Sequence, residues 1–149
     1  MRRTLLALGC AILLPVGVAS WPAIAAAGEQ PAIEVQDWTL VGHSDATVMF
    51  IKTAESPPGN GYRRVLVRFE EARPFDRRNF ASMSDVEIDE IDCAQQKTRV
   101  IQDTRYAERN MKGESRTDTV QTPVWKSEAK GSFGAGILKA VCGETDAGI

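Results

Sequence analysis

Polar and apolar residues alternate along much of this chain, which is the pattern of β-strands with one buried and one solvated face. Within residues 62–70, Val65 and Val67 share one face, and the arginines on either side of them lie on the other. Turn-forming residues rich in proline, glycine and asparagine separate such segments. We predict strands at residues 33–42, 46–52, 62–70, 80–93, 97–107 and 115–122.

The long strand at residues 80–93 contains a change in parity. Val86 and Ile88 share one parity, and Ile91 has the other. One extra residue in a strand reverses the face that later side chains occupy. We therefore predict a β-bulge at Asp89-Glu90, which would keep all three apolar residues on one core.

The C-terminal part of the chain changes to helical periodicity. Ile137 and Val141 are four residues apart, and similar spacing continues through residues 133–141. Ser132 is a suitable N-cap, and Gly143 is a suitable stop. Strands followed by one helix predict a domain of the α+β class.

The chain opens with the pattern of a secretory signal peptide. Arg2 and Arg3 precede an uncharged apolar run over residues 5–18, and small residues at 25–27 fit a cleavage site. A membrane anchor is the alternative, but the run is short for a spanning helix. Cys10 suggests a lipoprotein box, although it stands too early in the run to leave a usable apolar region before it.

Cleavage would divide the 149 residues into a signal peptide, 1–27, and a single domain, 28–149, with no transmembrane segment left. The whole chain carries 20 acidic residues, and 16 basic residues remain once the two arginines of the signal peptide are removed. A mildly acidic domain lacks the positive charge that neutralises phosphates. We therefore expect no nucleic-acid partner.

Only two cysteines, Cys93 and Cys142, remain after removal of the signal peptide. In an oxidising compartment such a pair becomes a disulfide, which here would pin the C-terminal helix to the sheet. A loop of about 50 residues predicts a stabilisation of roughly 4 kcal/mol. A catalytic or metal-binding thiol pair is the alternative, but the chain has no CxxC motif and a single histidine.

Two clusters of chemically active residues do not predict an enzyme. Residues 43–45 are His-Ser-Asp, but adjacent residues in a turn cannot form the hydrogen-bond relay of a hydrolase triad. An acidic run in the strand at residues 80–93 could gather a calcium ion, or could form a solvated face. We expect no enzyme activity, no metal and no cofactor. The acidic run consists of Asp85, Glu87, Asp89, Glu90 and Asp92.

The segment between residues 52 and 78 is basic, and it includes a polar stretch, 71–79, that we interpret as a connection. The basic side chains could pair with the acidic strand that follows, or could form a patch for an acidic partner. The candidate partner-binding residues are Arg64, Arg68, Arg73, Arg77 and Arg78. The aromatic residues predicted to fill the core are Trp38, Trp125 and Phe133.

Several short motifs, in this order and spacing, resemble the surface-adhesin protein E family over residues 38–143. The resemblance implies an antiparallel sheet of about six strands, packed on one C-terminal helix and closed by the disulfide. It also implies binding of host extracellular-matrix or serum proteins, and a homodimer is known in the family. The motifs are Trp38-Thr39-Leu40-Val41-Gly42, Phe80-Ala81-Ser82, Ile91-Asp92-Cys93, Tyr106, Met111-Lys112-Gly113, Trp125 and Ala140-Val141-Cys142-Gly143.

Together these observations predict an exported, non-enzymatic, adhesin-like binding protein of the periplasm or cell surface, with a protein as its partner. The partner would contact the solvent face of the sheet near Arg64, Arg68 and residues 71–79. The alternative is a periplasmic structural or envelope-associated protein with an unknown ligand.

The disulfide gives the first testable prediction. Mass spectrometry of the exported protein, digested without reduction, should yield one peptide pair that joins Cys93 to Cys142, because export exposes both thiols to an oxidising compartment. Two free thiols in that protein would contradict the prediction.

Overall fold

The computed structural model describes residues 31–56 and 61–143. The predicted signal peptide, Cys10 and part of the predicted turn at 56–61 lie outside the described residues. The elements are β1 (Thr39–His43), β2 (Thr47–Thr53), β3 (Arg63–Arg77), β4 (Phe80–Asp92), β5 (Lys97–Glu108), β6 (Lys112–Thr119), β7 (Lys126–Ser127) and α1 (Phe133–Cys142).

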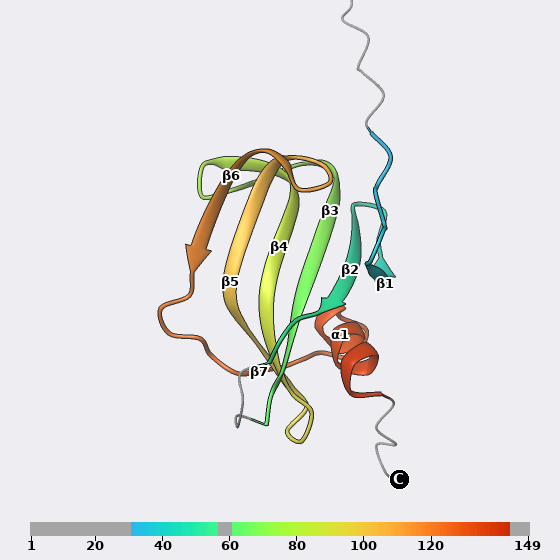
Figure 1. Cartoon of the computed structure of the whole chain (residues 1–149), viewed down its shortest axis with the longest axis vertical. Helices are drawn as coiled ribbons and strands as arrows, with labels where there is room; N and C mark the ends of the chain where they lie inside the picture. The colour runs from blue at the N-terminus through green and yellow to red at the C-terminus, as the bar shows by residue number, and fades with distance from the viewer. Residues whose placement is uncertain (1–30, 57–60, 144–149) are drawn as a thin grey trace, which may run out of the picture. The chain divides into compact units, whose positions relative to one another are not determined.

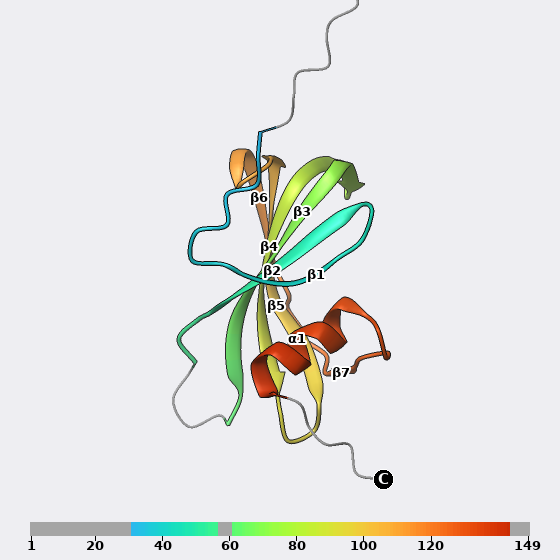
Figure 2. The same ribbon diagram turned by 90° about the vertical axis from the view of Figure 1, so that its right-hand side faces the viewer.

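The strands form one antiparallel sheet in which each of the first five strands pairs with the next along the chain, from β1 to β6. The short β7 pairs with the beginning of β5. Figures 1 and 2 show α1 against one end of the sheet, while the β3–β4 hairpin lies at the opposite end. This arrangement confirms the predicted α+β class and the predicted C-terminal helix.

We call the face of the sheet that packs against α1 the inner face, and the opposite face the outer face. The register places Met49 opposite Phe69 and Ile51 opposite Val67, so these side chains share the inner face. Alternation along β2 and β3 therefore supplies the sheet's side of the core. The buried core consists of Met49, Ile51, Val65, Val67, Ile91, Ile137 and Leu138.

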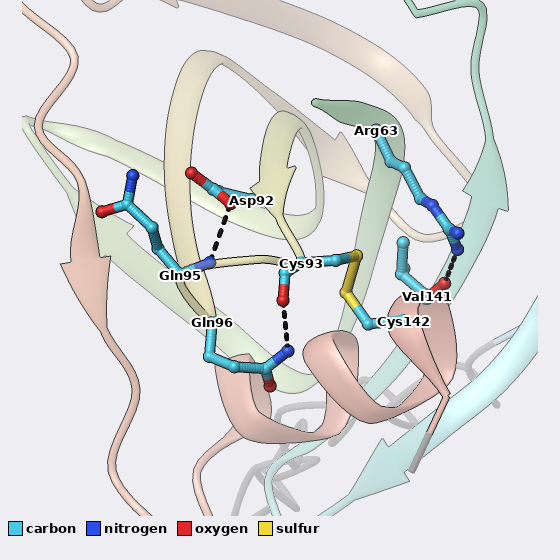
Figure 3. The surroundings of a disulfide bond; sticks show 7 residues. All are labelled: Arg63, Asp92, Cys93, Gln95, Gln96, Val141 and Cys142. Carbon is cyan, nitrogen blue, oxygen red and sulfur yellow. Dashed lines mark hydrogen bonds between the residues drawn. A yellow bond between two sulfur atoms is a disulfide. The ribbon is translucent and has the colours of Figure 1, made fainter. Parts of the chain in front are cut away.

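The helix is fastened at both ends. Ser132 caps its start by accepting a hydrogen bond from the Ala135 amide, as predicted. Near its end a disulfide joins Cys93, just after β4, to Cys142, with Cα atoms 5.5 Å apart (Figure 3). Beside it, Arg63 donates a hydrogen bond to the carbonyl of Val141. The predicted disulfide is thus confirmed as a link between sheet and helix.

The predicted connection at residues 71–79 is wrong, because β3 continues to Arg77. Its pairing with β4 is interrupted after Glu70 and resumes at Phe75, so that four residues of β3 lie opposite Met83 alone. Pro74 falls within this interruption, where its missing amide hydrogen costs no ladder hydrogen bond. Proline and charged side chains made a bulged strand resemble a loop.

The predicted bulge occurs at the expected place but on the other strand. Ile88 pairs with Gln102 and Asp89 pairs with Val100, so the extra residue is Ile101 of β5. The pairing of β4 with β3 runs without a break through this region. A bulge distorts the strand that carries it, so β4 keeps its alternation.

Uninterrupted alternation in β4 places Val86 and Ile88 on the outer face, whereas Ile91 lies on the inner face. The prediction that all three share one core is therefore wrong. The same alternation brings the side chains of Asp85, Glu87 and Asp89 to the inner face, opposite Phe69, Val67 and Val65, respectively.

In the N-terminal segment, residues 31–38, the strand predicted to begin at residue 33 is absent, since β1 begins at Thr39. Asn110, in the β5–β6 turn, holds this segment at two points. Its Oδ1 accepts from the Glu34 amide at 2.7 Å, and its Nδ2 donates to the Ala32 carbonyl at 2.9 Å. The N-terminal segment therefore crosses to a turn that is far away in the sequence.

The expectation that Arg68 faces solvent is also wrong, because its side chain is only 1% exposed. The guanidinium donates to Glu70 Oε1 at 2.7 Å, to the Glu34 carbonyl at 2.7 Å and to Asn110 Oδ1 at 2.9 Å. Trp38 covers it, with 5.5 Å between the guanidinium carbon and the ring centroid. Arg68 thus joins the N-terminal segment to the outer face.

Replacing Arg68 by methionine should lower the free energy of unfolding by about 3–5 kcal/mol, because Glu70 would remain buried without its ion-pair partner. Replacing Glu70 by leucine as well should recover much of this loss, since a buried pair can give way to apolar packing. Urea unfolding measures both effects. Arg64→Met is the control, and an Arg68→Met variant as stable as that control would contradict the assignment.

Candidate functional site

The end of the β3–β4 hairpin, residues 71–79, folds over the inner face of β5 and β6, and we call it the hairpin tip. Its turn residues Arg78 and Asn79 have φ of 54° and 60°, as a tight two-residue turn requires. Arg78 forms an ion pair with Asp118 of β6 at 3.0 Å. Arg105 of β5 donates to the Arg77 carbonyl at 2.7 Å. Figure 1 shows the hairpin reaching across to β6.

The hairpin tip gathers three of the five candidate arginines, Arg73, Arg77 and Arg78, on an exposed surface. Phe75 lies among them and is 46% exposed. The long reach of the hairpin, rather than a flat strand face, brings these side chains together.

The other two candidates lie on the outer face. Arg68 is buried, as described above. Arg64 forms an ion pair of 2.6 Å with Glu90, which pairs equally closely with Arg99 of β5. This ladder confirms cross-strand charge pairing for Arg64. It leaves Arg64 partly exposed but engaged within the sheet.

Of the three aromatic residues predicted to fill the core, one packs against it and two stack on arginine side chains. Phe133 packs against the hydrophobic core. Trp125 instead lies under the guanidinium of Arg99, at 4.3 Å from its ring centroid, and Trp38 covers Arg68. Both tryptophans are partly exposed and stack on cations, so the prediction is wrong for them.

The acidic run is divided between the two faces, and it does not form the solvated face that was one of its two interpretations. Asp85 and Asp89 are almost fully buried on the inner face. Asp103 of β5 lies opposite Glu87 and adds a fourth carboxyl group to that face. No three histidine, cysteine, aspartate or glutamate side chains within residues 31–56 and 61–143 are placed to hold a metal ion.

Burial shifts the ionisation of these carboxyl groups. Desolvation, reinforced by the nearby charge of Asp103, raises the pKa of Glu87 to about 7. Desolvation, with Glu87 and Glu128 nearby, raises the pKa of Asp89 to about 8. Lys126 of β7 opposes both shifts. Desolvation also raises the pKa of Asp85.

In the His-Ser-Asp sequence at residues 43–45, His43 ends β1, and Ser44 and Asp45 lie in the turn to β2. The hydroxyl of Ser44 accepts hydrogen bonds from the amides of Ala46 at 3.2 Å and Thr47 at 3.0 Å. This hydroxyl therefore stabilises the turn, as serine often does. Among the described residues no helix has the length and apolar character needed to cross a membrane.

A six-stranded antiparallel meander with one C-terminal helix and a disulfide at their junction defines a small α+β domain. The sequence profile described as surface-adhesin protein E matches residues 38–143. The chain belongs to the surface-adhesin protein E family, and the predicted resemblance is confirmed.

Two solved structures of protein E from Haemophilus influenzae share this fold. One has 11% sequence identity and a TM-score of 0.52, and the match covers 76% of this chain and 94% of that chain. The other, from a non-typeable strain, has 9% identity and a TM-score of 0.53, and covers 76% of this chain and 80% of that chain. No curated protein sequence matches this chain significantly.

The raised pKa values predict that stability falls as pH rises. Carboxyl groups of an unfolded chain titrate near pH 4, so between about pH 4 and 8 the folded protein binds more protons than the unfolded chain. The free energy of unfolding should therefore decrease across this range as Glu87 and Asp89 lose their protons.

Asp89→Asn should remove part of this dependence. At pH 8 the variant should be more stable than the wild type by at least about 1.4 kcal/mol, the equivalent of one pKa unit. At pH 3, below the ordinary pKa of an aspartate, the difference should be small, because Asp89 is then protonated in both the folded and the unfolded wild type. Urea unfolding at both pH values measures this, with exposed Asp45→Asn as control. Equal pH dependence in Asp89→Asn and wild type would contradict the prediction.

Proposed function

We propose that this protein is an exported, non-enzymatic binding protein that acts at the cell surface and engages acidic regions of host extracellular-matrix or serum proteins. The observation that carries the proposal is the exposed hairpin tip of a member of the surface-adhesin protein E family. The predicted signal peptide supports export.

The composition of the hairpin tip suits a protein partner. Arginine and aromatic residues dominate the energetically important positions of protein interfaces. Arg78 retains 71% side-chain exposure despite its ion pair, and Phe75 presents apolar area beside it. Arg73 is exposed and forms no ion pair within the described residues. The tip therefore offers positive charge together with a surface that can be desolvated.

The structural framework supports presentation of this tip. Hydrogen bonds and ion pairs to β5 and β6 hold it over the sheet. A held loop loses little conformational entropy when it binds a partner. The outer-face arginines Arg64 and Arg68 are already engaged with Glu90 and Glu70, so we leave them out of the proposed contact.

Arg73→Ala/Arg78→Ala should weaken binding to an acidic matrix or serum protein by about tenfold or more, because charge and contact area are lost together. Surface plasmon resonance against a panel of such proteins measures the effect. Binding by the wild type should also weaken as salt increases, since exposed charges are screened.

Arg64→Ala is the matched control, because it removes an arginine from the outer face. A larger loss in this control than in the hairpin variant would place the contact on the outer face instead. Protease treatment of intact cells tests the proposed location. Full protection of the protein there would favour the alternative of a periplasmic, envelope-associated role.

A further inference from the structure

A pocket of about 320 Å³ lies on the inner face between the hairpin tip and the start of α1. Three phenylalanines line it: Phe69 and Phe75 of β3, the second of them in the hairpin tip, and Phe133 of α1. The rings of Phe69 and Phe133 meet edge to face, with centroids 6.1 Å apart. These walls are apolar and partly fixed by core packing.

Carboxyl groups line the same pocket. Asp85 is 3% exposed, and its Oδ1 atom has no hydrogen-bond partner within the described residues. Glu87, two residues further along β4, makes no hydrogen bond or ion pair with any described residue. Glu71 adds a third carboxyl group. Buried acceptors in folded proteins are normally satisfied, so an unpaired carboxylate oxygen beside a pocket points to a missing donor.

The lining contains a single basic residue, Arg77, among the residues the structure describes. Its guanidinium pairs with Asp103 at 3.6 Å and lies over the Phe75 ring at 5.3 Å. Arg77 thus already interacts with Asp103 and Phe75. The pocket lining includes three acidic residues and this one basic residue. The lining therefore holds more acidic groups than basic ones.

We propose that this pocket binds a primary alkylammonium group of the kind carried by a lysine side chain. The three N–H donors of such a group can reach carboxylates that lie on neighbouring strands. The alkyl stem would pack against the phenylalanine rings, which also attract the positive charge through their faces. This site shares Phe75 with the hairpin-tip contact, but it uses neither Arg73 nor Arg78 and does not depend on that contact.

Other cations fit the lining less well. A trimethylated ammonium has charge and apolar surface but cannot donate a hydrogen bond to Asp85. A guanidinium is a planar fork that matches the two oxygens of one carboxylate, whereas acceptors here come from separate residues. Desolvation raises the pKa of Asp85 and of Glu87. Binding should therefore release protons and strengthen between pH 6 and pH 8.

The test is a titration of the exported protein with Nα-acetyl-lysine methylamide, followed by NMR chemical shifts of the β4 amides. The compound should bind, and its norleucine analogue, which lacks the ammonium, should bind at least tenfold more weakly. The trimethyl-lysine and arginine analogues should also bind more weakly. Equal binding of the norleucine analogue would overturn the proposal. Equal binding of either cationic analogue would overturn its restriction to primary amines.

Isosteric variants locate the site. Asp85→Asn/Glu87→Gln should weaken binding of the lysine compound at least tenfold. Asp89→Asn is the matched control, because it alters a buried carboxyl group on the same face that does not line the pocket, and its affinity should stay within twofold. Thermal unfolding confirms that each variant folds. Unchanged affinity in the folded double variant would overturn the proposal.

Discussion

The packing of α1 against one end of the inner face is the contact on which the rest of the structure depends. The helix is short and contains two glycines, so it has little stability by itself. Gly136 allows close approach, since a Cβ at this position would lie 3.2 Å from the Val41 side chain. The disulfide between Cys93 and Cys142 closes a loop of 49 residues and holds the helix on Ile91 and its neighbours. Tertiary packing and a covalent link thus replace intrinsic helix stability.

Because α1 covers only part of the inner face, the remainder of that face requires another cover. The hairpin tip supplies it by folding back over β5 and β6. Carboxyl groups such as Asp85 and Glu87 are therefore enclosed between hairpin and helix without full neutralisation. The same fold-over presents Arg73 and Arg78 to solvent. The folding of the hairpin tip over the inner face therefore accounts both for the exposed arginines of the tip and for the pocket lined by acidic residues beneath it.

Local patterns were sufficient to predict most elements. Alternation located β2, β4 and the first half of β3, and the capped periodicity located α1. The predictions failed where pairing between strands decided the outcome. The bulge lies at Ile101 rather than in β4, and this difference determines that Val86 and Ile88 face outward while Asp89 faces the core. A parity change in one strand cannot show which of two paired strands carries the extra residue.

The sequence by itself determined the positions of most strands, the helix and the disulfide, because these follow from periodicity and from the number of cysteines available for pairing. Only the tertiary structure decided which charges are buried. Arg68 and Glu70 have the alternation of a solvated face, yet residues 31–38 and Asn110 cover them. The candidate pocket likewise joins β3, β4, the hairpin tip and α1. Contacts between distant segments set burial, and a local pattern contains no information about them.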